Sequence, residues 1–217
     1  SAASDVYKRQ IRLIFILGAL TATVTGFAEV RSVWLQGSEI IGETDVDGIV
    51  EFKGIPFAKA PIGSLRWQSP QELESLPNPL LANRWMPACP QSDSNTRWYQ
   101  QLAERLPTNM GSGLVHAAPS TNENCLGLNI WVPLNATRAE PMAVLVWIHG
   151  GGHRDGYAYE PNYHGATLAK RGNLIVVSIA YRLNVLGFLP PPALIKSALP
   201  LGIQDQLLAL QWIQKNI

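Results

Sequence analysis

The fold is decided by the stretch Met142-Ala-Val-Leu-Val-Trp-Ile-His149-Gly150-Gly151-Gly152-His153-Arg154-Asp155-Gly156. Its first seven residues are apolar without alternation, which favours a strand buried on both faces of a parallel sheet. The glycines that follow remove the side chains at the carboxyl end of this strand, where ligands bind in open α/β sheets. The stretch therefore predicts an anion- or oxyanion-binding loop at the end of a buried strand.

The residues after this loop complete an α/β pattern. Leu174–Ala180 is a second uninterrupted apolar run, and Leu168–Lys170 predicts a helix that ends at Gly172. The roughly 25 residues between the two strands allow a right-handed crossover, which predicts parallel pairing. Ile203–Asn216 has a helical pattern with one polar stripe. The order strand, helix, strand, helix is typical of the α/β class.

The composition predicts a globular chain without a polyanionic partner. Hydrophobic residues make up 47% of the 217 residues, charged residues make up 15%, and the net charge is +1. A basic or acidic bias that would indicate nucleic acid is absent from these numbers. The sequence contains no internal repeat and no linker, so we expect residues 29–217 to belong to one domain.

The N-terminal segment has the pattern of a signal peptide. Three basic residues precede the apolar run Leu13–Leu20, and small residues at positions 26 and 28 fit cleavage after Ala28. Threonines in the second half of the run disfavour the alternative, a membrane anchor. We therefore expect a signal peptide over residues 1–28, a secreted protein and no stable membrane span after cleavage. Because the sequence begins with serine, residues 1–10 could also be non-native.

Two cysteines, Cys89 and Cys125, are the only ones in the chain. In an exported protein a single pair most simply bonds to itself, although two unpaired buried thiols remain an alternative. The only Asn-x-Ser/Thr sequon begins at Asn135, which makes this residue a glycosylation candidate.

The glycine loop has several interpretations. As a phosphate-binding loop, Gly150–Gly152 lacks a further glycine at dinucleotide spacing and a Gly-Lys-Ser/Thr ending. As a metal site, His149 and His153 lie four residues apart, a spacing that aligns ligands on a helix, and three glycines disfavour a helix. An oxyanion hole for acyl transfer fits His-Gly-Gly-Gly after a strand, with a plain tight turn as the remaining alternative. We expect neither a metal nor a cofactor.

Seven motifs resemble, in order, those of the type-B carboxylesterase/cholinesterase family. They cover nearly all of the chain from about residue 37 onward, and they lie at Phe52–Ala58, Pro61–Trp67, Cys89–Gln91, Asn122–Pro133, Val146–Gly152, Ala180–Leu189 and Gly202–Ile217. The resemblance implies the N-terminal part of an α/β-hydrolase fold, with a central, mostly parallel sheet and flanking helices. It also implies hydrolysis of small carboxylic esters through an acyl-enzyme, by a serine, an acidic residue and a histidine.

The resemblance also implies roles for individual residues. The backbone N–H groups of Gly151 and Gly152 would line the oxyanion hole, with His149 and Gly150 supporting the loop. The sequence ends at Ile217, before the family's Gly-x-Ser-x-Gly motif, so the triad is expected beyond this residue and the 217-residue chain is expected to be inactive.

Further positions match or depart from the family pattern. Cys89–Cys125 matches the family's first disulfide, and Arg66 and Glu123 match an ion pair, with two solvated charges as the alternative. His153 replaces an aromatic residue and Tyr157 a small one, which makes both candidates for the substrate pocket.

Two other classes of protein within the family are alternatives to a carboxylesterase. The segment Gly113–His116 lacks the tryptophan that cholinesterases place there, which disfavours a cholinesterase. The alternative to an enzyme is a cholinesterase-like adhesion or binding ectodomain without a nucleophile. The oligomeric state cannot be predicted from these motifs.

Overall fold

The computed structural model describes residues 29–107, 113–137, 140–194 and 197–217, so the predicted signal peptide lies outside the described residues. The strands are β1 (Glu29–Leu35), β2 (Ser38–Thr44), β3 (Ile49–Pro56), β4 (Leu80–Leu81), β5 (Gly127–Pro133), β6 (Val144–Ile148) and β7 (Ile175–Ile179). The helices are α1 (Ser94–Arg105), α3 (Ala166–Gly172), α4 (Asn184–Gly187) and α5 (Leu201–Asn216).

The strands form one sheet in the order β1-β2-β3-β5-β7-β6, with β4 beside β2. β6 and β7 are parallel, as the crossover through α3 predicts, and β2 and β4 are also parallel. The other pairs are antiparallel, so the expected mostly parallel sheet is corrected to a mixed sheet over the described residues. Short connections explain the antiparallel pairs β1–β2 and β2–β3. Gln36 and Gly37, with φ of 51° and 79°, form a two-residue turn between β1 and β2.

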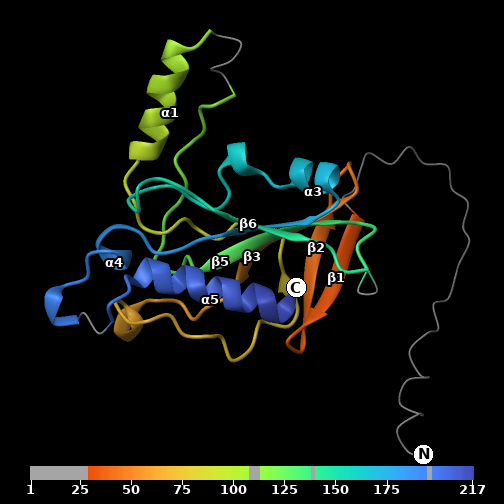
Figure 1. Ribbon diagram of the computed structural model, residues 1–217, viewed down its shortest axis with the longest axis horizontal. Helices are drawn as coiled ribbons and strands as arrows, with labels where there is room; N and C mark the ends of the chain where they lie inside the picture. Colours follow the sequence, from red (N-terminus) through yellow and green to blue (C-terminus); the bar gives the residue numbers. More distant parts are fainter. Residues whose placement is uncertain (1–28, 108–112, 138–139, 195–196) are drawn as a thin grey trace, which may run out of the picture.

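Helices pack on both faces of the sheet, which confirms the α/β class (Figure 1). On one face, Trp212 and Ile213 of α5 share a buried cluster with Val177 and Ile179 of β7. On the other face, α3 packs against Val176 and other buried residues. The alternation of side chains along β7 therefore supplies both layers of the core.

Strand β6 differs from its prediction. Val144, Trp147 and Ile148 are 38%, 38% and 40% exposed, whereas the sequence predicts burial on both faces. The reason is position: β6 lies at the edge of the sheet, and within the described residues it pairs with β7 alone. An unbroken apolar run indicates that a strand can be buried, but not which neighbours bury it.

Helix α1 stands away from the body of the molecule (Figure 1), and none of its residues is buried. Its first turn contacts the glycine loop through side chains described below. Over the described residues, no helix combines the length and apolar character needed to cross a membrane.

Candidate active site

The glycine loop, residues 149–156, begins where β6 ends, and its backbone requires glycine. Gly151 has a φ of +112°, and a Cβ there would lie 1.8 Å from the carbonyl oxygen of Asp155. Gly156 has a φ of +104°, and a Cβ there would lie 2.4 Å from the carbonyl oxygen of Gly150. The turn is therefore too tight for side chains at these two positions.

The backbone amides of Gly151 and Gly152 are available to a ligand. The carbonyl of Gly151 accepts bonds from the N–H groups of Arg154 and Asp155, at 3.1 and 3.2 Å. The N–H groups of Gly151 and Gly152 themselves donate to no acceptor in the described part of the chain, and both residues are exposed. Two neighbouring free donors at the end of a strand are what stabilisation of a developing oxyanion requires.

His149 lies beneath the loop as a buried support. Its ring stacks on Tyr181 with centroids 4.4 Å apart, and the hydroxyl of Tyr181 donates to the carbonyl of His149 at 2.7 Å. Nδ1 lies 2.9 Å from the carbonyl oxygen of Gly150, which can only accept, so Nδ1 carries the proton. Burial lowers the pKa of His149 to about 4, which keeps the ring neutral at neutral pH.

An open groove of about 560 Å³ lies between the glycine loop and α1. Its lining includes the three glycines, aromatic side chains and two carboxylates: Gly150, Gly151, Gly152, Trp98, Tyr99, Tyr163, Asp155 and Glu160. The groove leads directly to the free amides and is large enough for a small organic ligand.

Two buried carboxylates join α1 to the loop and to the segment that follows it. Asp155 accepts a hydrogen bond from the hydroxyl of Ser94. Glu160 accepts bonds from Asn95 Nδ2 and the hydroxyl of Tyr99, both at 2.9 Å. Burial raises the pKa of Glu160 despite these bonds. Sequence reasoning missed both acids because nothing in the local pattern distinguishes them from solvated charges.

The two predicted pocket residues lie beside the loop. The ring of His153 stacks on Phe188 with centroids 4.1 Å apart and an interplanar angle of 6°. Tyr157 is buried and lines a small internal space together with Cys89 and Cys125. Neither side chain lines the groove between the loop and α1.

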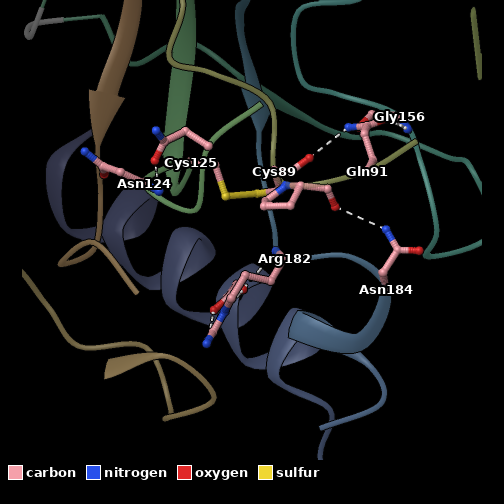
Figure 2. The surroundings of a disulfide bond; sticks show 10 residues. Cys89, Gln91, Asn124, Cys125, Gly156, Arg182 and Asn184 are labelled. Carbon is pink, nitrogen blue, oxygen red and sulfur yellow. Dashed lines mark hydrogen bonds and ion pairs between the residues drawn. A yellow bond between two sulfur atoms is a disulfide. The ribbon is translucent and has the colours of Figure 1, made fainter. Parts of the chain in front are cut away.

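Cys89 and Cys125 form the expected disulfide. The segment Cys89–Gln91, called the disulfide arm below, contacts the loop (Figure 2). Gln91 donates from Nε2 to the carbonyl of Gly156 and accepts from its N–H group, both at 2.8 Å. These reciprocal bonds fix the far end of the loop to the disulfide arm.

Two further predicted features lie away from the groove. Arg66 and Glu123 form a bidentate ion pair, with Nε 2.6 Å from Oε2. Asn135 is exposed in a turn after β5, where its Nδ2 donates to Asn173 Oδ1 at 3.3 Å. Across the described ranges, no group of three or more His, Cys, Asp or Glu side chains could hold a metal ion.

A sheet with helices on both faces and a strand that ends in a glycine loop with free amides matches the α/β-hydrolase fold. The chain belongs to the carboxylesterase family, because the model of that family matches residues 29–217.

Individual relatives agree with this assignment. Mouse cholinesterase is 37% identical over 169 residues, which cover 78% of this chain and 26% of that protein. Para-nitrobenzyl esterase of Bacillus subtilis is 35% identical over 187 residues, or 85% of this chain and 34% of that protein. The solved structure of a thermophilic PNB esterase superposes with a TM-score of 0.71 at 32% identity, covering 86% of this chain and 35% of that one. The chain thus spans about a third or less of these relatives.

Proposed function

We propose that this chain is the N-terminal part of a carboxylic ester hydrolase that works through an acyl-enzyme. The observation that carries the proposal is the pair of exposed amides at Gly151 and Gly152, which have no partner among the described residues and lie beside an open groove. When a nucleophile attacks an ester, negative charge develops on the carbonyl oxygen, and the two N–H groups would donate to it. The substrate is a small carboxylic ester that enters through the groove.

The other catalytic groups would come from sequence beyond Ile217. The serine nucleophile, its histidine base and an acidic residue belong there, together with a third oxyanion donor from the residue after the serine. Alone, the 217-residue chain would therefore bind the carbonyl but not attack it. Its neutral His149 acts through the loop backbone and not as a base.

The protein is also proposed to be secreted. The disulfide between Cys89 and Cys125 supports an oxidising compartment, in agreement with a signal peptide at residues 1–28. The exposed amide of Asn135 would be an acceptor for a glycan in a host that glycosylates.

The proposed function is tested by Gly151→Ala in the whole protein that carries this chain. The added Cβ collides with the carbonyl of Asp155, so the loop must move and its donors leave their positions. We expect kcat for a para-nitrophenyl ester to fall on the order of 100-fold, the usual effect of losing one oxyanion donor.

The matched control is Gly37→Ala. Gly37 also has a positive φ, +79°, but lies in the β1–β2 turn with nothing within 4 Å of an added Cβ. This variant keeps wild-type kcat. A whole protein that neither hydrolyses esters nor reacts with a fluorophosphonate would instead support the adhesion or binding ectodomain.

A further inference from the structure

Helix α4 begins beside the glycine loop, at a residue with an unusual backbone. Asn184 has a φ of +52°, in the left-handed region. Its backbone N–H donates to the carbonyl of His153 at 2.9 Å. Its side-chain Nδ2 donates to two more carbonyls, that of Arg154 at 2.6 Å and that of Pro90 at 3.1 Å. One residue thus makes three bonds to the loop and to the disulfide arm.

We infer that Asn184 is a positioning residue for the oxyanion hole, which holds the glycine loop against the disulfide arm. The inference rests on the proposed function, because it assigns the purpose of the contact to the amides of Gly151 and Gly152. Asn184 does not touch the substrate; it acts on those amides through the turn that contains them.

The path from Asn184 to the amides is short. Arg154, whose carbonyl Asn184 binds, donates its own N–H to the carbonyl of Gly151. Pro90 directly follows Cys89 of the disulfide, and Figure 2 shows the side chain of Asn184 directed toward this arm. The bridge therefore connects the turn of Gly151 to a covalently fixed part of the chain.

Gln91 holds the end of the loop from the same arm, through its two bonds to Gly156. His153, whose carbonyl accepts the bond from the N–H of Asn184, stacks with its ring on Phe188 just after α4. Asn184, Gln91 and Gly156 do not line the groove, so these contacts leave the exposed amides of Gly151 and Gly152 unobstructed.

Asparagine meets both requirements of position 184. The backbone needs a residue that tolerates the left-handed region, which asparagine and glycine do best. The two carbonyls need a donor with two hydrogens, which the asparagine amide provides and glycine lacks. Aspartate would place a carboxylate against two carbonyl oxygens.

A loosened turn would weaken stabilisation of the transition state more than binding of the substrate. Oxyanion donors must lie within about 3 Å of a charge that is absent from the bound ester, so misplaced donors lower kcat more than they raise KM. An inhibitor that forms a tetrahedral oxyanion, such as a trifluoromethyl ketone, should lose affinity by the same factor as kcat/KM.

The test is Asn184→Gly in the whole protein, since glycine keeps the backbone conformation and removes only the side-chain bonds. We expect kcat to fall about 10-fold, KM to stay within about twofold, and the trifluoromethyl ketone to bind about 10-fold more weakly. Asn184→Asp should lose more than Asn184→Gly. The matched control is Asn173→Gly, the same change at another left-handed asparagine, with a φ of 47°, after α3. This control keeps wild-type kcat.

The outcomes separate the inference from the proposed function. If the wild-type protein hydrolyses esters, Gly151→Ala is impaired, and Asn184→Gly keeps its kcat and inhibitor affinity, the inference alone is overturned. If Asn184→Gly loses activity only in proportion to a lowered melting temperature, Asn184 is merely structural and the inference also fails. A wild-type protein without esterase activity overturns the proposed function, and the inference with it.

Discussion

β6 and β7 are parallel five-residue strands that end side by side, but the chain continues differently after each of them. After β6, Gly151 and Gly152 of the glycine loop are exposed, and their amides have no partners among the described residues. After β7, Tyr181 and Arg182 are buried and hydrogen-bonded. Below, the segment after β6 is called the open end, because two of its amides are without partners among the described residues, and the segment after β7 is called the closed end.

The closed end supports the open one. Tyr181 donates to the carbonyl of His149 and stacks on its ring, so the segment after β7 holds the base of the loop after β6. Unpaired donors can stabilise developing charge only if they are already in place, because moving them during the reaction would cost the energy that they provide. The partners of the closed end therefore bear on the proposed chemistry of the open end.

The largest effect is expected from removing the ion pair of the closed end. Side chains of Arg182 and Asp205 are 3% and 0% exposed, and their two side-chain bonds are 2.8 and 2.7 Å long. Arg182→Leu would leave Asp205 buried without its charged partner, with only the bond from the backbone N–H of residue 182, which costs about 3–5 kcal/mol of unfolding free energy. Urea denaturation of the whole protein measures this loss.

A control pair shows whether burial is the cause. Lys59 and Glu74 also lie 2.7 Å apart, but their side chains are 35% and 86% exposed. Lys59→Leu should cost less than about 1 kcal/mol. Equal losses of stability for the two variants would mean that burial does not increase the contribution of the Arg182–Asp205 ion pair.

A smaller effect is expected from pH at the base of the loop. Burial lowers the pKa of His149 from 6.5 to about 4 in the folded protein. As the pH falls from 6.5 to 4, the unfolded chain binds a proton that the folded protein does not, so stability falls over this window. The loss is on the order of 3 kcal/mol.

His149→Asn isolates this contribution. The variant should be less stable than wild type at pH 7.5, because the stack on Tyr181 is lost, but its stability should fall less between pH 6.5 and 4. Denaturation curves at several pH values measure both quantities. Parallel pH profiles for variant and wild type would show that His149 is not held neutral by burial.

The two strands also differ in how well the sequence predicts them. Leu174–Ala180 and the helix that ends at Gly172 have strong local patterns, and the structure confirms both. The exposure of β6 could not be predicted, because an apolar run does not reveal its neighbours.

The contacts of the candidate site could not be predicted from the sequence for a related reason. The glycines of the loop stand out in the sequence because the backbone itself requires them. Glu160 and Asn184 have ordinary types at unremarkable positions, and their partners lie 61 and 94 residues away, at Tyr99 and Pro90. Such pairings depend on the folded arrangement of distant segments, which no local pattern contains.

The smallest effect is expected from the single hydroxyl that joins the two strand ends. Tyr181→Phe removes the bond to the carbonyl of His149 but keeps the stacked rings, so we expect a loss of about 1 kcal/mol in urea denaturation. Tyr157→Phe is the control, since Tyr157 is also buried but its hydroxyl makes no hydrogen bond within the described ranges. Equal losses for both variants would mean that stacking alone couples the closed end to the open one.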